Sequence, residues 1–104
     1  MDVSLETETD GRLLLKLQND EWEVNVRAPR AELLKLRGIR TANWNERRSI
    51  EAGESVGARA FWTVDGENAM LMIGLDDETW DIALSVPVET VGEIVRQAHL
   101  IDVG

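Results

Sequence analysis

Cysteine is absent from this chain and histidine occurs once, which narrows the chemistry open to it. Without cysteine there are no disulfides, thiolate zinc sites or cysteine nucleophiles. The motif G-x-S-x-G is also absent, and the stretch "GESVG" (53–57) has neither Walker nor dinucleotide spacing. The one histidine, His99, lies near the end of a predicted helix, where it serves more often as a charge partner or solvent residue than as a catalyst. Carboxylate acid/base chemistry stays open, but no spacing selects a pair. We therefore expect no enzyme and no cofactor.

Membrane signals are missing as well. The N-terminal residues 1–6 show neither a basic segment nor an apolar one, so no signal peptide is visible. No apolar run approaches the roughly 20 residues that a membrane helix needs. We expect a cytoplasmic protein with no membrane partner.

Positive charge is scarce and unevenly placed. The chain has 104 residues, enough for one domain with a modest core, and its net charge is −9. Residues 30–48 carry six basic and two acidic side chains, a net of +4, which leaves −13 on the remainder. Such a field repels nucleic acid and favours basic partners, although it also serves solubility alone.

What the chain does have is an internal similarity. Shifted by 58 positions, residues 13–38 align with residues 71–96 without a gap. The identical pairs are Leu13 with Leu71, Leu17 with Leu75, Trp22 with Trp80 and Pro29 with Pro87. Apolar positions between them also agree, which indicates a duplicated unit.

Each half predicts the same elements. Alternating segments predict strands over 3–9, 12–18, 21–27, 58–64, 69–75 and 79–86. A proline then opens each helix, predicted over 30–37 and 88–100, and Gly38 follows the first. We expect an α+β fold, a duplicated βββα-βββα with a pseudo-two-fold axis, whose six strands form an antiparallel sheet or a half-open barrel packed by two helices. The single domain, 1–104, divides into repeat 1 (2–38), a connector (39–57) and repeat 2 (58–101).

Side-chain alternation predicts which face of each strand is buried. A three-residue bulged turn over 10–12, with Gly11 in the left-handed conformation, would pair Thr7 with Leu15 and Leu5 with Leu17, and it keeps carboxylates off the core face. The expected core is Val3, Leu5, Leu13, Leu15, Leu17, Trp22, Val24, Val26, Leu33, Leu36, Leu71, Ile73, Leu75, Trp80, Ile82, Leu84, Val91, Ile94 and Val95.

The acidic run Asp76, Asp77 and Glu78 has two interpretations. Several carboxylates together are the ligands of magnesium or calcium, so these residues are candidates for a metal site. Consecutive residues at a strand end point apart, however, and the equivalent stretch 18–21 is also acidic and turn-forming. A turn is the favoured interpretation.

The connector has no equivalent in the second half. Its segment "NWNERRSI" (43–50) concentrates residue types that are enriched at binding hot spots. Trp44 either folds back as a lid over the core or contacts a partner, together with its neighbours in the loop. The candidate partner-binding residues of this loop are Trp44, Asn45, Glu46, Arg47 and Arg48.

A second candidate surface comes from the strand faces. If Trp62 points inward with Ala58 and Ala60, then Phe61 lies on the outer face with Met70, Met72 and Ala83. Such an apolar patch needs a cover, which is the connector, a second copy of the chain or a partner. A one-residue change of register would exchange Phe61 and Trp62.

These features favour a small acidic protein-binding module that acts by stoichiometric association with a basic partner. In size, charge and compactness the chain resembles the small acidic immunity proteins that neutralise basic toxin domains, and antitoxin-type inhibitors. That resemblance implies an inhibitor but identifies no site residues. The alternatives are a homodimeric structural or regulatory domain joined through the apolar sheet face, and a small-ligand domain with a pocket lined by tryptophans.

Overall fold

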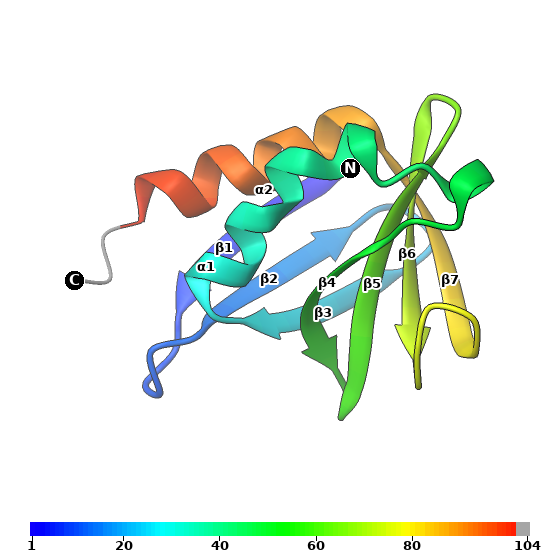
Figure 1. The fold of residues 1–104 in the computed structure, drawn as a ribbon. Coiled ribbons are helices and arrows are strands. Elements are labelled where there is room, and N and C mark those ends of the chain that lie inside the picture. The colour runs from blue at the N-terminus through cyan, green and yellow to red at the C-terminus, as the bar shows by residue number, and fades with distance from the viewer. Residues whose placement is uncertain (102–104) are drawn as a thin grey trace.

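The computed structural model describes residues 1–101, which form one antiparallel sheet of seven strands with helices on one face (Figure 1). The strands follow one another across the sheet in the order of the sequence. They are β1 (Asp2–Thr7), β2 (Leu13–Gln18), β3 (Glu23–Ala28), β4 (Ile50–Ser55), β5 (Ala58–Asp65), β6 (Asn68–Gly74) and β7 (Trp80–Pro87). The α-helices are α1 (Arg30–Leu34) and α2 (Val88–Leu100), and the 3-10 helices are η1 (Lys35–Thr41) and η2 (Trp44–Glu46).

The α+β class is correct, but the predicted six-stranded duplication is wrong, because the sheet contains seven strands. The additional strand is β4, which lies in the predicted connector. Its pairing with β5 shifts between Glu51 and Glu54, and Gly53 adopts a φ of +87° there. This bulge interrupts the alternation by which a strand is recognised in a sequence. Glycine is required, because a Cβ at position 53 would lie 2.5 Å from Cγ1 of Val26.

The sheet divides into two groups of strands at β3 and β4, which share a single residue pair, Arg27 with Glu54. Strands β1–β3 run across the direction of strands β4–β7 (Figure 1). Between β3 and β4 the chain leaves the sheet to form α1, η1 and η2. The helices therefore lie inside the bend of the sheet, where both groups of strands contact them.

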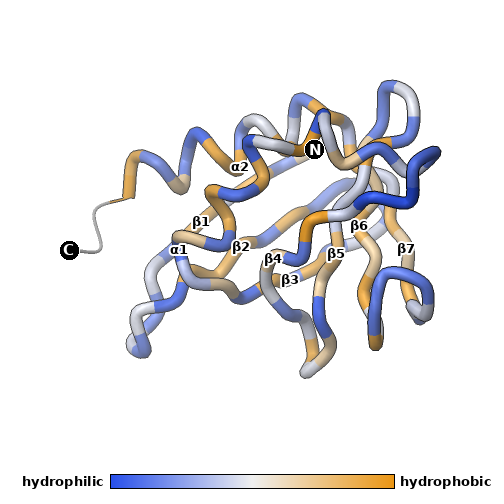
Figure 2. Tube along the Cα trace, in the orientation of Figure 1, coloured by the Kyte–Doolittle hydropathy of each residue, from blue (hydrophilic) through white to orange (hydrophobic). Residues whose placement is uncertain are grey.

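The second helix has the predicted bounds and the first does not. α2 begins directly after Pro87, and its trace alternates between hydrophobic and hydrophilic residues (Figure 2). α1 is short and continues as η1 through Gly38, where the Thr41 hydroxyl donates to the Gly38 carbonyl at 2.7 Å. Arg30 joins α1 to α2, because its Nε–H donates to the carbonyl of Ala98 at 2.8 Å. No helix within residues 1–101 has both the length and the apolar character that a bilayer crossing requires.

The core lies between the sheet and the helices. Its fully buried large side chains come from both groups of strands and from both helices: Leu13, Leu15, Leu17, Val26, Leu33, Leu36, Trp62, Leu71, Val86, Val91 and Ile94. Each contributes about 1.5–3 kcal/mol relative to exposure in water. Three predicted core residues are wrong: Leu75 is 79% exposed, Ile82 is 49% exposed, and Trp80 is not among the residues that pack against the core.

The first hairpin keeps the predicted parity but not the predicted register. Leu5 pairs with Leu15 and Thr7 with Leu13, so the strands are offset by two residues from the expected pairing. The loop has three residues as predicted but spans 9–11 and not 10–12, because the Glu8 N–H donates to the Arg12 carbonyl at 2.8 Å. Gly11 has the expected left-handed conformation, with a φ of +88°.

The ungapped sequence similarity is not followed by the strand register. In the first half Leu13 pairs with Ala28, which at a shift of 58 would place Leu71 opposite Val86. Leu71 instead pairs with Leu84. The two hairpins therefore differ by two residues in register, and equivalent sequence positions do not occupy equivalent positions in the sheet.

Candidate functional site at the connector

The segment 42–49 is tied to the sheet at both of its ends. Asn43 forms a parallel bridge with Val64, whose N–H donates to the Ala42 carbonyl at 2.8 Å. The hydroxyl of Thr63, which is fully buried, lies 2.7 Å from the Ala42 carbonyl and 2.8 Å from the Arg48 carbonyl. One side chain of β5 thus fixes where the loop leaves the sheet and where it returns.

Asn43 organises the loop between these two points. Its Oδ1 accepts the N–H of Asn45 at 2.8 Å, and its carbonyl accepts the N–H groups of Glu46 and Arg48, each at 3.1 Å. Arg47 adopts a left-handed conformation with a φ of 56°, which ends η2. The loop therefore presents its exposed side chains on an ordered backbone.

An aromatic pair joins this loop to β7. The rings of Trp44 and Trp80 meet edge to face, with centroids 5.8 Å apart and an interplanar angle of 78°. The guanidinium carbon of Arg47 lies 4.6 Å from the centre of the Trp44 ring. Edge-to-face pairs add about 0.5–1.5 kcal/mol beyond burial, and an exposed cation over a ring adds about 0.5–1 kcal/mol. Both tryptophans are half-buried, so Trp44 covers the sheet and still reaches the surface.

Trp80 faces the connector because of a bulge in β7, opposite the end of β6, which leaves Asp81 without a partner in the ladder. The pairing of β6 with β7 shifts between Ile73 and Gly74, and Gly74 is opposite Trp80. A Cβ at position 74 would lie 2.3 Å from the Cα of Trp80, so the close approach requires glycine. Trp22, the residue that aligns with Trp80 in the sequence, packs against the core. The prediction that both tryptophans have the same core role is therefore wrong for Trp80.

The acidic run lies beside the connector. Asp76 Oδ1 accepts the N–H groups of Glu78 at 2.9 Å and Thr79 at 2.7 Å, which closes a turn. Asp77 Oδ2 accepts the hydroxyl of Ser49 at 2.8 Å, which joins the turn to the loop. Among residues 1–101 no group of three or more carboxylate or histidine side chains is placed to hold a metal ion.

The second set of candidate residues is covered by the chain itself. Trp62 points into the core as predicted, and its indole N–H donates to the Ala52 carbonyl at 3.0 Å. Phe61 and Met72 pair on the opposite face, yet they are only 9% and 0% exposed. Met70 is half-buried. Thr63, on the same face of β5 as Phe61, binds the connector, and Trp44 of the connector packs on Trp80, so we infer that the connector covers Phe61 and Met72.

The exposed candidates all belong to one surface, which we name the connector surface. It comprises Trp44, Asn45, Glu46, Arg47, Arg48, Asp76 and Glu78. Arg48 is paired with Glu46 at 3.4 Å, whereas Asp76 and Glu78 are exposed carboxylates. The sequence indicated the two segments separately, but nothing in it showed that they lie together.

Three residues that hold the site were missed. Thr63 lies on the face of β5 that also carries Arg59 and Phe61, and it gives no signal in the sequence. Ser49 has no neighbouring motif that would mark it either. Asn43 does carry a signal, because asparagine is a preferred residue directly before a helical turn.

Glu32 fixes the bulged strand behind the connector. Its Oε1 accepts the Gly53 N–H at 2.9 Å and lies 3.2 Å from Nη2 of Arg59. Partial burial raises the pKa of Glu32, but the Gly53 N–H and the Arg59 guanidinium lower it by more, so the pKa lies below its ordinary value. Glu32 therefore connects α1 to β4 as an ionised group.

Comparisons of the chain with protein-family models, with curated proteins and with solved structures find no match. Its function is therefore inferred from its own residues. Two clefts, about 360 Å³ and about 560 Å³ in volume, are lined by residues other than tryptophan.

Proposed function

We propose that this chain is a non-enzymatic protein-binding module that inhibits a basic partner by stoichiometric association, in the manner of immunity or antitoxin proteins. The partner docks on the connector surface. A cytoplasmic location is part of the proposal.

The observation that carries the proposal is the ordered presentation of Trp44 and Arg47. Tryptophan and arginine dominate binding hot spots, and a side chain that is already ordered loses less entropy on binding. Trp44 is held by the edge of Trp80, and Arg47 is stacked on Trp44. The exposed rim of this pair is available to a partner without rearrangement of the loop.

Charge supports the choice of a basic partner. The chain has a net charge of −9, and Asp76 and Glu78 are exposed carboxylates in the turn that leads into Trp80. Complementary charge steers association and acts mainly on the rate of encounter. The complex should therefore form faster at low ionic strength than at high ionic strength.

Support for a binding role rather than catalysis comes from the sequence, which offers no nucleophile motif. The homodimer alternative required an uncovered apolar sheet face. Because Phe61 and Met72 are buried beneath the connector, the apolar sheet face no longer supports the homodimer alternative.

Calorimetric titration with the basic products of the neighbouring genes tests the proposal. We expect one partner to bind in a one-to-one ratio, and Trp44→Ala to weaken its Kd about 30-fold, the roughly 2 kcal/mol typical of a hot spot. Arg47→Glu should weaken binding as well. Arg96→Glu, a charge reversal on α2, is the matched control and should leave the Kd unchanged.

Trp44→Phe separates binding from folding, because phenylalanine still covers the sheet. Its thermal unfolding should match the wild type while its affinity falls. If no neighbouring product binds, or if binding is the same for Trp44→Ala and Arg96→Glu, the proposal is wrong.

A further inference from the structure

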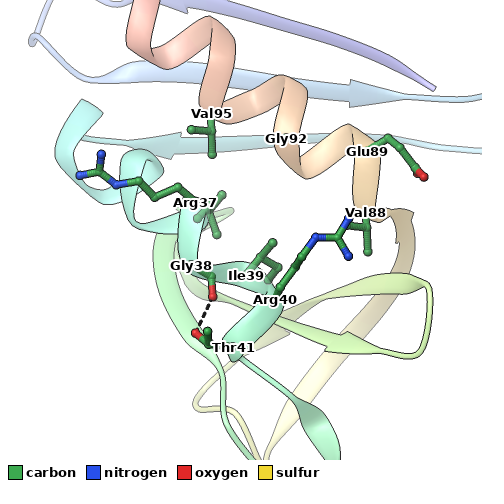
Figure 3. Close-up of a pocket in the computed structure, with 10 residues that line it drawn as sticks. Arg37, Gly38, Ile39, Arg40, Thr41, Val88, Glu89, Gly92 and Val95 are labelled. Atoms are coloured by element: carbon green, nitrogen blue, oxygen red, sulfur yellow. Dashed lines mark hydrogen bonds between the residues drawn. The ribbon is translucent and has the colours of Figure 1, made fainter.

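A second surface feature lies away from the connector surface, between η1 and α2. It is a cleft of about 360 Å³, within the size range of small-molecule sites. Its apolar lining comes from Leu36, Ile39, Val88 and Val95 (Figure 3). Figure 3 also shows Gly92 on the helix above these side chains.

Gly92 is unusual because nothing in the fold requires it. Glycine within a helix is less favourable than alanine, yet Gly92 lies in the middle of α2. Its φ is not in the left-handed region, and a Cβ built there would meet no atom within 4 Å. Neither backbone geometry nor tight packing explains the residue. Its effect is to leave the cleft open at the centre.

Two arginines flank the same cleft. Arg40 extends toward Val88, and Arg37 lies at the other end of the cleft with its guanidinium directed away from Arg40 (Figure 3). The chain has 20 acidic side chains and 11 basic ones, so carboxylate partners are plentiful. Even so, neither arginine makes an ion pair or a side-chain hydrogen bond within residues 1–101.

Other arginines of the described chain are engaged. Arg12, Arg27 and Arg59 pair with carboxylates, and Arg30 bonds to the end of α2. Glu89 also lines the cleft, so its three charged side chains, Arg37, Arg40 and Glu89, leave a net charge of +1 on a largely acidic molecule. That charge suits an anion, and the floor of the cleft suits a short apolar chain.

We propose that this cleft binds a small anionic amphiphile, a carboxylate or phosphate head on a short alkyl or aryl body. The body lies against the apolar lining beneath Gly92, and the head pairs with Arg40 or Arg37. The site shares no residue with the connector surface, so it is independent of the proposed partner-binding function.

Octanoate and octyl phosphate are the probes, followed by NMR titration of the ¹⁵N-labelled chain. Both should bind and shift the amide signals of residues 36–41 and 88–95. Hexanoate, shorter by two methylenes, should bind about 15-fold more weakly, since each buried methylene is worth about a factor of four. Octylamine should not bind, and inorganic phosphate alone should bind more weakly than octyl phosphate.

Three variants test the geometry. Gly92→Leu places a side chain in the cleft and should weaken octanoate binding at least tenfold, while circular dichroism and thermal unfolding show that the helix is retained. Arg40→Gln should weaken binding without blocking the cleft. Arg96→Gln, on α2 but outside the lining, should bind as the wild type does.

Several results would overturn the assignment. They are equal binding of octylamine and octanoate, signal changes confined to other elements, or unchanged affinity in folded Gly92→Leu. Co-sedimentation with phosphatidylglycerol vesicles in the absence of octanoate binding would also overturn it, because the ligand would then be a membrane surface.

Discussion

Replacing Thr63 by valine removes the hydroxyl that holds the connector on the sheet. Thr63 is fully buried, and its Oγ1 lies 2.7 Å from the Ala42 carbonyl and 2.8 Å from the Arg48 carbonyl. Valine has a similar shape and the same β-branch, so it fits the strand. The change therefore tests the hydrogen bonds more than the packing.

The Thr63 hydroxyl carries one hydrogen, which the two carbonyls share, so the expected cost depends on the donors that each carbonyl keeps. The Ala42 carbonyl keeps the Val64 N–H as a donor at 2.8 Å. The Arg48 carbonyl has no other donor within residues 1–101, although it lies close enough to the surface to gain water. The loss of one hydrogen bond and the incomplete hydration of one carbonyl should together lower the free energy of unfolding by about 1–2 kcal/mol. In a domain of this size that lowers Tm by roughly 5–10 °C.

Urea unfolding followed by circular dichroism gives the global loss, and amide hydrogen exchange gives its location. Amides of residues 45–48 should lose protection while those of β5 keep theirs. Thr90→Val is the matched control, since Thr90 is buried and its hydroxyl has no partner within residues 1–101; it should be nearly neutral. Equal stability of Thr63→Val and the wild type, with unchanged exchange in the loop, would refute the reasoning.

Three further perturbations have defined outcomes. Gly53→Ala should destabilise the fold by about 3 kcal/mol in urea unfolding, because it combines a left-handed φ with a clash against Val26. Gly57→Ala, at a similar φ but in open space, should cost only about 1 kcal/mol. Equal losses of stability in the two variants would contradict this reasoning. Arg30→Met removes the donor to the last carbonyls of α2, which should cost about 1 kcal/mol and speed amide exchange at that helix end; unchanged exchange would exclude the capping role. Arg96, and then Gln97, lower the pKa of Glu93 to about 2 from 4.5, so its stabilising effect is complete above pH 4.5 and is lost as the pH falls toward 2. Glu93→Gln should therefore flatten the pH dependence of unfolding in that interval, and an unaltered dependence would contradict the assignment.

Regular elements were predictable from the sequence because their patterns are uninterrupted. The positions of six strands and the bounds of α2 follow from alternation, helical spacing and the proline before the helix. The inward orientation of Trp62 and the left-handed Gly11 were predicted for the same reason.

Bulges account for most of what the sequence did not predict. The bulge at Gly53 interrupts the alternation that would have identified β4 as a strand. The bulge opposite Gly74 places Trp80 on the opposite face from its sequence counterpart Trp22. A bulge adds one residue to one strand, so it reverses the faces beyond it without altering the local composition. Leu75 is exposed because it lies beyond the end of β6, and Ile82 pairs with buried Ile73 but lies on the edge strand β7.

The candidate site was predicted in part. Both "NWNERRSI" and the acidic run stand out in the sequence, but their association depends on the Ser49–Asp77 hydrogen bond and on the contact of Trp44 with Trp80. These are contacts between distant segments, which no local pattern specifies. The buried state of Phe61 and Met72 depends on the same contacts.

Hydrogen exchange of the chain in complex with a basic neighbouring gene product tests the binding surface most directly. Protection should rise in residues 43–49 and 75–79 and stay unchanged along the outer turns of α2. Protection confined to α2 or to β1–β3, with the connector surface exchanging as in the free chain, would contradict the assignment of this loop as the docking site.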